Sequence, residues 1–499
     1  VVQTSRASRF TPSPLWYNRF QYMEERERGF DWEEDLFLPG IIEVPVERKC
    51  TVILSVCGDI MPHRVPNPTA IWKTEVVRRG RDQAADKRET SGFTGEDREH
   101  LLALHRAARS FLITTPSGRP AVIAGYPWFG SWGRDTLISL PGLCFSTGRI
   151  AAGIEILTEI GRHERDGLLP NFFSGDGKPE AYNTVDSSLW YFWTVQNLGT
   201  RCGIMSPDKA LIRERFWPVM KRIIRSLMDG TRFGIGMDAL GLLQAGDGQT
   251  ALTWMDATVG GIPVTPRHGY PVEINALWYN ALCFARDLTA EFGDPPFFDG
   301  DFIPLLRRSF RETFWGHDAA SRPQGCLGDV FRDGVLDTAV RPNQIFAVSL
   351  PFSPLDPAEQ TAVVRAVREQ LLVPCGLRTL SPADPAYRGR YRGSPAERDG
   401  AYHQGTVWPW LLGAFGEAAL RVADDPEQEK ENLRQYLRTF LRQHLVEAGI
   451  GSVSEVFDGD APHRPGGCIA QAWSVAELLR LYTLLEDRRQ PAIFPYPKP

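Results

Sequence analysis

The alternation of short and long connections between predicted helices constrains the fold of this chain more than any other feature. From about Thr94 onward, apolar residues repeat with the period of amphipathic α-helices. The connections after the second, fourth, sixth, eighth and tenth helices are short, whereas those after the odd-numbered helices are long and rich in Gly, Pro and aromatic residues. Twelve helices are predicted, over 97–113, 134–147, 150–163, 185–200, 207–229, 271–292, 300–314, 342–351, 357–371, 403–422, 426–446 and 469–486.

This alternation has a geometric meaning. Helices joined by short connections run antiparallel to each other. If the twelve helices form six hairpins around a ring, the six long connections all emerge at one end and build a funnel there. The sequence therefore predicts a mainly α fold, an (α/α)6 toroid. A solenoid of stacked hairpins is the alternative, but no repeat of fixed period is visible in the sequence.

Individual helix boundaries have local signals. Asp356 is a candidate N-cap, Pro357 suits the first helical position, and Glu359 completes a capping box. Ser206-Pro207 predicts another helix start in the same way. Pro218 lies inside that second helix, so it should kink or split the helix.

The N-terminal part of the chain reads differently. Residues 41–46 and 51–56 are short β-type runs around the polar turn 47–49. They predict a small β segment, the remnant of a β-sandwich-type domain. The predicted organisation is the tail of a β domain over 1–60, a linker over 61–93, the (α/α)6 catalytic domain over 94–487 and a C-terminal tail over 488–499.

Charge and composition exclude several kinds of partner. The 499 residues have a formal net charge of -5, and no basic run compensates for it, which argues against nucleic acid as a partner. No stretch is long and apolar enough to span a bilayer, and residues 1–10 lack the layout of a secretory signal. The eight cysteines are scattered without a CxxC pair, so we expect a reducing, cytoplasmic environment. The oligomeric state does not follow from the sequence.

Tryptophans in the long connections point to a sugar-binding pocket. The chain has 14 Trp and 27 Phe, and many of the tryptophans lie in Gly/Pro-rich segments beside charged residues. The first long connection contains Trp128, Trp132 and the pair Arg134-Asp135. Asp can accept hydrogen bonds from sugar hydroxyls and Arg can donate them. Asp135 could instead be a first-turn helix residue with Arg134 as its partner.

The other long connections contain further candidates with competing structural roles. In the connection after the third helix, which is the second long connection, Asn183 precedes Asp186. Taken alone, Asp186 is more typical of a helix cap. In the connection after the fifth helix, which is the third long connection, Asp256 follows Trp254. A carboxyl beside a large aromatic ring is partly desolvated, as a general acid should be. Arg267 lies further along this connection. Glu273 follows at the next helix start, where negative charge also suits the helix dipole.

The connection after the ninth helix, which is the fifth long connection, leads into His403, Gln404 and Trp408. His403 could act as a base or a zinc ligand, but no second His or Cys lies at metal-ligand spacing and no HExxH motif occurs. A hydrogen bond to a sugar hydroxyl is a better fit. The acidic run 458–460 lacks the twelve-residue EF-hand pattern. We therefore predict no metal and no cofactor.

The ring geometry pairs two carboxylates. Asp256 lies in the third of the six long connections and Glu455 in the sixth, so a closed ring places them across the funnel from each other. An inverting glycosidase needs this arrangement, because an acid protonates the leaving oxygen while a base activates water on the opposite face. The two carboxyl groups of such enzymes are typically ~6.5–9.5 Å apart.

Several strings in these connections resemble the amylo-α-1,6-glucosidase family, the debranching part of glycogen debranching enzymes. They follow the family's order from about residue 94 to the C-terminus, and the segment YNRFQYMEERERGFDWEEDLFLPG resembles the end of the β domain that precedes the toroid in bacterial members. The strings are WFGSWGRDTLISLPG, GLLPNFF, YNTVDSSLW, TWMDA, VTPRHGYPVEINALWYNAL, RPNQIFAVSLP, GLRTLSP, YHQGTVWPW and VSEVFDGD.

The resemblance implies inverting hydrolysis of α-1,6-linked glucose stubs on glycogen or limit dextrin, with release of glucose. It implies that Asp256 is the general acid and Glu455 the general base, with Asp135 as the main rival for the acid. It also implies that Arg134 and Asp135 hold the terminal glucose. Trp128, Trp132, Trp190, Trp254 and Trp408 are the expected pocket walls, and Asn183, Asp186, Arg267, Glu273, His403 and Gln404 complete the expected substrate-binding set.

Two features depart from the eukaryotic family pattern. Nothing in the chain resembles the barrel of the 4-α-glucanotransferase domain that eukaryotic debranching enzymes contain, and the β domain looks truncated. Two alternatives to debranching therefore stay open. One is an exo-acting α-1,4-glucosidase that resembles glucoamylase, and the other is a glucan-binding toroid without catalytic activity.

Overall fold

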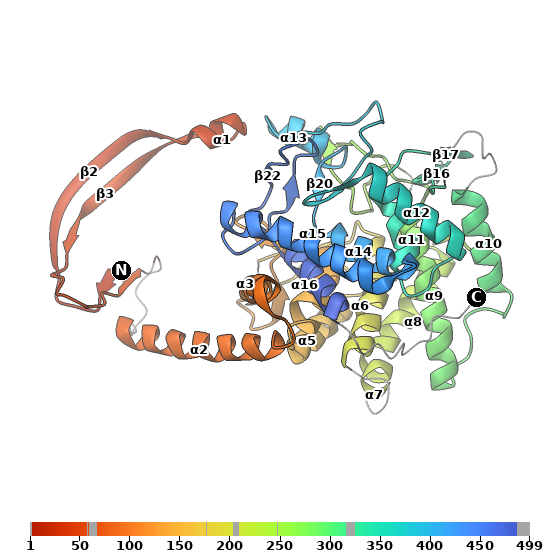
Figure 1. The fold of residues 1–499 in the computed structure, drawn as a ribbon, viewed down its shortest axis with the longest axis horizontal. Helices are drawn as coiled ribbons and strands as arrows, with labels where there is room; N and C mark the ends of the chain where they lie inside the picture. Colours follow the sequence, from red (N-terminus) through yellow and green to blue (C-terminus); the bar gives the residue numbers. More distant parts are fainter. Residues whose placement is uncertain are drawn as a thin grey trace. The chain divides into compact units, whose positions relative to one another are not determined.

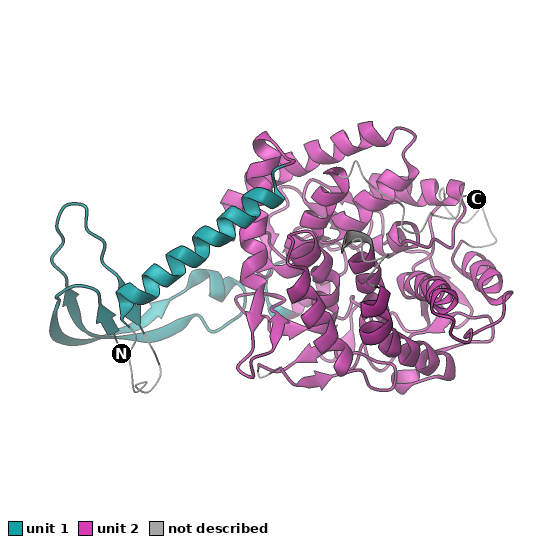
Figure 2. Ribbon diagram, turned by 90° about the horizontal axis from the view of Figure 1, so that it is seen from below, with its two compact units in different colours: residues 1–91, 392–395 teal, residues 92–391, 396–499 magenta. Residues whose placement is uncertain are grey.

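The chain divides into two compact units in a computed structural model. The structure describes residues 2–56, 58, 67–175, 177–202, 209–246, 248–315 and 325–486. Unit 1 comprises residues 1–91 with 392–395, and unit 2 comprises residues 92–391 with 396–499 (Figure 2). Each unit is described by itself below.

Unit 1 is built from two antiparallel strand pairs and two helices. The long strand β2 pairs with β3, and the short strand β1 pairs with β4. The runs 41–46 and 51–56 therefore lie in different sheets, because residues 41–43 end β3 whereas residues 54–56 form β4. The elements are β1 (Val2–Thr4), β2 (Arg9–Gln21), α1 (Met23–Glu27), β3 (Glu33–Glu43), β4 (Leu54–Val56) and α2 (Pro68–Glu89).

Unit 2 consists of twelve principal helices among its described residues, in the order that the sequence predicts (Figure 1). Two of them adjoin π-helical segments. Pro141–Phe145 follows α4, and Ile212–Phe216 precedes α8. The helices are α3 (Gly95–Phe111), α4 (Gly133–Leu140), α5 (Ile150–Arg162), α6 (Asp186–Cys202), α8 (Trp217–Asp229), α9 (Val272–Phe292), α10 (Phe302–Phe314), α11 (Phe346–Ser349), α12 (Pro357–Gln370), α14 (Leu411–Val422), α15 (Pro426–Glu447) and α16 (Ala472–Glu486).

Every second helix belongs to an inner ring. In the described part of the chain, α4 packs on α6, α6 on α9, α9 on α11, α11 on α14, α14 on α16, and α16 back on α4. The remaining six helices pack outside this ring; α15, for example, contacts both α3 and α16. The closed succession confirms the predicted (α/α)6 toroid.

Packing explains why the inner helices are apolar on nearly all sides. In α9, sixteen of the residues from Val272 to Thr289 are buried. The outer helix α8 instead buries one stripe, which includes Val219, Ile223 and Leu227. A helix surrounded by protein needs apolar residues all round, whereas a surface helix needs only one apolar face.

Local sequence signals locate several helix boundaries correctly. The capping box at α12 is present: Glu359 accepts a hydrogen bond from the Asp356 backbone N–H at 2.9 Å, and the Asp356 side chain accepts one in return. Pro218 falls at the second position of α8, directly after the π-helical segment, which confirms the predicted interruption. The expected start at Ser206-Pro207 lies outside the described residues.

The predicted helix over 403–422 is wrong in its first turns. The short helix α13 (Pro395–Tyr402) ends where it was expected to begin, and α14 starts only at Leu411. Gly405 has φ +136°, in the region that favours glycine, and Val407 and Trp408 form the extended strand β20. Strand pairing with residues 377–378 thus replaces helical hydrogen bonds in this segment.

The six long connections are joined into a closed circle of backbone hydrogen bonds in the described part of unit 2. Two junctions are single bonds, from Val185 N–H to Leu252 O at 2.9 Å and from Ser381 N–H to Val340 O at 3.0 Å. The other four junctions are strand pairs: β8 (Ser131–Trp132) with β9 (Phe172–Phe173), β15 (Tyr270–Pro271) with β16 (Val330–Arg332), β20 (Val407–Trp408) with β21 (Val456–Phe457), and β23 (Ala470–Gln471) with β7 (Gly125–Tyr126).

Each inner helix begins at this circle, so the positive ends of their dipoles point toward it. Further short strands either extend these junctions or form separate two-stranded pairs. They are β5 (Leu112–Thr114), β6 (Pro120–Val122), β10 (Pro179–Ala181), β11 (Gly236–Met237), β12 (Leu243–Gln244), β13 (Thr258–Val259), β14 (Ile262–Pro263), β17 (Val335–Asp337), β18 (Leu372–Val373), β19 (Gly376–Arg378) and β22 (Pro465–Gly466).

Candidate active site

Arg134 is the central cation of the candidate site. Its Nε donates to both carboxylate oxygens of Asp186, at 2.8 and 2.9 Å, and its Nη1 donates to Asp256 Oδ2 at 3.0 Å. Thr184 Oγ1 lies 3.4 Å from Nη2. Because the Arg134 side chain is only 4% exposed, these bonds replace water around the guanidinium. One side chain thus links the first, second and third long connections.

Asp135 lies in the first turn of α4, where the helix dipole favours a negative charge. Its Oδ1 is 3.4 Å from Gln471 Nε2, which belongs to the last connection. Burial raises the pKa of Asp135 to about 7, the Arg134 charge opposes that rise, and the charges of Asp256 and Glu455 add to it. Asp135 is therefore close enough to both predicted catalytic carboxyls to respond to their charge.

Asp256 differs from its neighbours by being accessible. Its side chain is 34% exposed, whereas the side chain of Asp186 is 1% exposed. Burial raises the pKa of Asp256, and the charge and hydrogen bond of Arg134 oppose that rise. A carboxyl whose pKa is raised and whose side chain is still accessible suits a general acid.

Glu455 is held by two donors just before β21. The Tyr402 hydroxyl donates to Oε1, and the Cys468 backbone N–H donates to Oε2 at 2.7 Å. Burial raises the pKa of Glu455 to about 7, although both hydrogen bonds oppose the rise. A carboxyl poised near neutrality can accept a proton from water at the pH of most cells.

Two residues of this arrangement were missed by the sequence reasoning. Tyr402 opens the string YHQGTVWPW, and Gln471 follows the segment that contains Glu455. Neither residue type has a local signal for bonding a carboxyl, because the partners are 53 and 336 positions away in the chain. Their proximity follows only from the closed ring.

The predicted tryptophan walls divide into two groups. Trp190, Trp254 and Trp408 are at most 4% exposed, whereas Trp132 is half-buried and Trp128 is exposed. Trp254 packs edge-on against Trp408 at 5.6 Å and donates from Nε1 to Asn343 at 2.7 Å. The buried tryptophans therefore make the rigid support beneath the site, and Trp132 and Trp128 offer accessible rings.

His403 lies within this aromatic support. Its ring stacks on Trp408 with centroids 5.5 Å apart and planes 16° apart. Burial and the nearby Arg341 charge lower the pKa of His403 well below its ordinary value, so the ring is neutral. Gln404, the next residue, accepts from Arg341 at 2.8 Å and donates to Val264 O at 3.3 Å.

Arg267 and Glu273 lie in a buried ion-pair network with Asp329. The Arg267 guanidinium donates to both carboxylates, and all three side chains are 2% exposed. Burial raises the pKa of Glu273, and Arg267 opposes the rise. Asp329 also accepts from Asn343 at 2.8 Å, so the network connects to Trp254. Asn183, in contrast, is half-buried and lies beside Thr184 in the second long connection.

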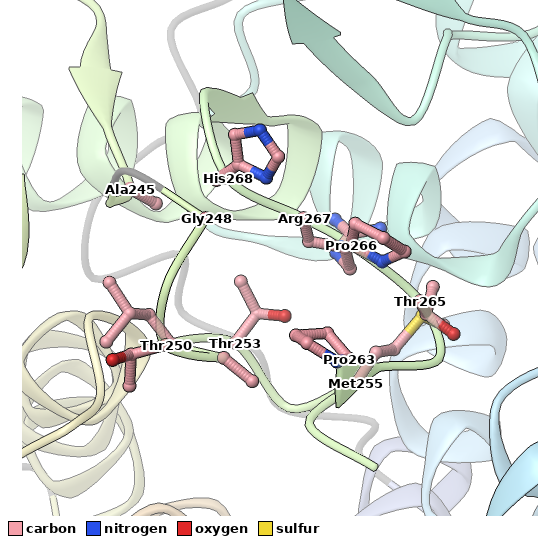
Figure 3. A pocket seen from close by; sticks show the side chains of 12 residues that line it. Ala245, Gly248, Thr250, Thr253, Met255, Pro263, Thr265, Pro266, Arg267 and His268 are labelled. Atoms are coloured by element: carbon pink, nitrogen blue, oxygen red, sulfur yellow. The ribbon is translucent and has the colours of Figure 1, made fainter. Parts of the chain in front are cut away.

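The segment before Asp256 is packed tightly against the next part of the same connection. Figure 3 shows the pocket between them, where Thr253 and Met255 face Pro263, Arg267 and His268. The pocket has room for about 10 Å³, which corresponds to roughly one water molecule. The residues directly before Asp256 thus pack closely against residues 263–268.

Neither a metal site nor a membrane helix is found in the described part of the chain. No group of three or more His, Cys, Asp or Glu side chains there could hold a metal ion. Helices long and apolar enough to cross a bilayer are likewise absent among those residues.

The sequence matches two family models. The description of the first is amylo-alpha-1,6-glucosidase, and it matches residues 106–480. The second is the N-terminal part of glycogen debranching enzyme, and it matches residues 1–53. The glycogen debranching enzyme of Saccharomyces cerevisiae is 26% identical over 471 residues, which cover 74% of this chain. The match spans only 30% of the yeast protein's length.

The fold is similar to that of solved bacterial structures. An uncharacterised conserved protein from Thermus thermophilus gives a TM-score of 0.53 at 13% identity, over 76% of this chain and 99% of that one. A GH63 mannosylglycerate hydrolase from the same organism gives 0.52 at 13% identity, over 76% of this chain and 100% of that one. At such low identity the likeness concerns the fold alone.

Proposed function

The chain belongs to the amylo-α-1,6-glucosidase family, and from that premise we propose that it releases single α-1,6-linked glucose residues from glycogen-type glucans. Its assignment to glycoside hydrolases of the glycogen debranching type rests on the family match over residues 106–480. The proposed release of single α-1,6-linked glucose residues is argued from the residues of the candidate active site. The observation that supports it most directly is that Asp256 and Glu455 lie on the third and the sixth of the six long connections, which are opposite each other in the order of the closed ring.

In the proposed reaction, Asp256 is the general acid. Its proton goes to the glycosidic oxygen as the bond from that oxygen to the glucose C1 breaks. Burial favours the protonated carboxyl, and the accessibility of Asp256 lets the leaving oxygen approach it.

Glu455 is the general base of the same step. It takes a proton from a water molecule whose oxygen attacks C1 from the opposite face, so the released glucose has the β configuration. The proton lost by Asp256 and the proton gained by Glu455 balance, and solvent exchange restores both groups.

Arg134 and Asp135 are proposed to hold the hydroxyls of the terminal glucose. Arg134 bonds Asp256 directly, and the charges of Asp256 and Glu455 both raise the pKa of Asp135. Trp128 and Trp132 provide accessible rings for stacking. Asn183, Asp186, Trp190, Trp254, Arg267, Glu273, His403, Gln404 and Trp408 are proposed to shape the substrate pocket, directly or by supporting residues that contact the sugar.

The decisive experiment is proton NMR of the sugar released from a glucosyl-branched α-1,6 oligosaccharide, followed from the first minutes. We expect β-glucose to appear first and to mutarotate afterwards. A linear maltooligosaccharide of equal length is the matched control and should be cleaved more slowly. Early α-glucose would contradict inversion, and faster cleavage of the linear substrate would contradict debranching.

The assignment of roles is tested by conservative variants. Asp256→Asn and Glu455→Gln should each reduce kcat by about 10³-fold or more, because each removes one proton-transfer group of the transition state. Asp135→Asn should chiefly raise KM. If Asp135→Asn instead retained substrate binding and lost kcat as fully as Asp256→Asn, Asp135 would be the acid.

A further inference from the structure

Glu455 receives a hydrogen bond from a side chain that the proposed reaction does not yet use. Tyr402 Oη donates to Glu455 Oε1, while the Cys468 backbone N–H donates to Oε2. The backbone donor comes from the same connection as Glu455, whereas Tyr402 comes from the end of α13 in the preceding one. The tyrosine is therefore a side-chain contact that ties the Glu455 carboxyl itself to the preceding connection.

Tyr402 is itself held on several sides. Its carbonyl oxygen accepts from Trp408 Nε1 at 3.0 Å. Its ring stacks on Tyr391 with centroids 5.4 Å apart and planes 30° apart, and Trp408 packs edge-on at 4.8 Å. A side chain with its ring and backbone both fixed leaves the hydroxyl little choice of direction.

The Tyr402 hydroxyl is protonated beside the Glu455 carboxyl. Burial, followed by the charge of Glu455, raises the pKa of Tyr402 well above its ordinary value. The phenol therefore keeps its proton at neutral pH and acts as a hydrogen-bond donor. A donor that points at a carboxylate oxygen stabilises the ionised form of that carboxyl.

We propose that Tyr402 is the positioning residue of the general base, which holds the Glu455 carboxylate ionised and turned so that a free lone pair faces the water-binding side. This inference rests on the proposed function of Glu455. The hydroxyl bonds Oε1 through one lone pair and leaves the second for water, since each carboxylate oxygen has two. Tyr402 does not contact the sugar in this arrangement and exchanges no proton with it.

The test is the Tyr402→Phe variant, which removes only the hydroxyl and keeps the stacked ring. We expect kcat to fall about 10- to 100-fold, the range that follows from losing one hydrogen bond to a charged group, while KM changes little. We also expect the acid limb of the kcat/KM profile to move about one pH unit higher, because an unsupported carboxylate takes up a proton more readily.

A matched control separates this role from a loss of packing. Tyr436, like Tyr402, is a partly buried tyrosine, and its hydroxyl donates to the carbonyl of Val373 in β18, directly after the outer helix α12. Tyr436→Phe should lower the melting temperature by about as much as Tyr402→Phe, yet leave the pH profile unchanged. Equal pH profiles for wild type and Tyr402→Phe would overturn the proposal.

A double variant tests whether Tyr402 acts through Glu455. In a Glu455→Gln background the residual kcat should be nearly the same with and without Tyr402→Phe, because the base is already absent. An undiminished 10-fold or greater loss there would assign Tyr402 another role.

A readout without substrate distinguishes this proposal from the proposed function. Titration of ¹³C-labelled glutamate carboxyls by NMR, with Glu455 identified by its loss in Glu455→Gln, should show a higher pKa for Glu455 in Tyr402→Phe. A shift in this titration together with no glucose release from any substrate would sustain the Tyr402–Glu455 coupling and reject the glucosidase. Glucose release without any shift of the Glu455 pKa would support the glucosidase and reject the coupling of Tyr402 to Glu455.

Discussion

Arg134 bonds two carboxylates from a buried position, and this makes it sensitive even to replacement by lysine. We predict that Arg134→Lys lowers kcat/KM at least about 100-fold and destabilises the fold by about 3 kcal/mol, because an ammonium cannot serve both Asp186 and Asp256 in the same fork geometry and leaves a buried charge unpaired. Glucose release and urea denaturation measure the two effects.

The control for this variant is Arg78, which also bonds two carboxylates, Glu75 at 2.6 Å and Asp82 at 2.9 Å. Its side chain is 58% exposed, so Arg78→Lys should leave the midpoint of urea denaturation nearly unchanged. Equal losses in the two variants would mean that burial does not determine the strength of the Arg134 bonds.

Asp135 should make stability depend on pH. Burial raises its pKa in the folded state from 3.8 to about 7, so between these values the native state binds more protons than the unfolded state. Its contribution is therefore favourable below about pH 4 and is lost as the pH rises through 7. We predict that Asp135→Asn is about 2–4 kcal/mol more stable than wild type at pH 8, with a smaller difference at pH 5.

Chemical denaturation at the two pH values measures this prediction. Asp256, the proposed general acid, is the comparison, because the same substitution there removes the charge from the acceptor of a direct Arg134 bond and should not stabilise to the same extent. A stability difference for Asp135→Asn that is constant from pH 5 to pH 8 would contradict the raised pKa.

At the residue scale, the sequence singled out Arg134 and the candidate carboxyls but not the side chains that hydrogen-bond to them. Arg134-Asp135 and Asp256 stand beside tryptophans in the long connections, and this context is visible without a structure. The hydrogen bond from Tyr402 to Glu455 is not visible, because it depends on how two connections meet in space. Burial of Arg267 and Glu273 in one ion-pair network is hidden for the same reason.

Helical elements were predictable where local chemistry determines their ends. The capping box at Asp356 starts α12 whatever surrounds it. The segment 403–410 was predicted to be helical, yet its residues Val407 and Trp408 form strand β20, because neighbouring strands offer hydrogen-bond partners on both sides. Such pairing is a property of the assembled ring, so periodicity alone assigns the segment incorrectly.

Close packing between α16 and the segment after α4 gives a prediction at the element scale. A Cβ added at Gly142 would lie 1.8 Å from the Ala476 carbonyl oxygen, so Gly142→Ala must push the last helix away from the first hairpin. We predict a loss of at least about 3 kcal/mol and a fall in activity, as expected for overpacking at a backbone contact.

Gly80 provides the opposite case for the same measurement by thermal denaturation. It lies inside α2, and nothing is within 4 Å of an added Cβ. Gly80→Ala should stabilise α2 by up to about 1 kcal/mol, since alanine is the better helix former. If Gly142→Ala were as well tolerated as Gly80→Ala, the packing of α16 on this segment would be looser than the structure indicates.

The whole molecule is held in register by closure of the ring. The first and last long connections meet where β7 pairs with β23, and α16 packs on α4 beside that junction. Alternating connection lengths predicted this topology, because six hairpins of similar size close most simply into a ring. The register of each junction was not predictable, since pairs of two-residue strands have no sequence signature of their own.

The distribution of buried residues leads to a prediction about the two units. Every residue of the hydrophobic core identified among the described residues, from Leu101 to Leu485, belongs to unit 2, and so does every member of the candidate site. In unit 1, the long strands β2 and β3 expose large apolar side chains, among them Trp16 and Phe37. Unit 2 therefore has the core that a domain needs to fold alone.

We accordingly expect a variant consisting of residues 92–499 to unfold cooperatively and to release glucose from a short branched oligosaccharide with kcat within about threefold of the full chain. The same fragment with Asp256→Asn is the inactive control. Glycogen provides a second comparison, because a selective loss on this large substrate would assign glucan binding to unit 1. Loss of kcat on the short substrate, with cooperative unfolding retained, would mean that unit 1 contributes to the site itself and that the core of unit 2 is sufficient for folding but not for catalysis.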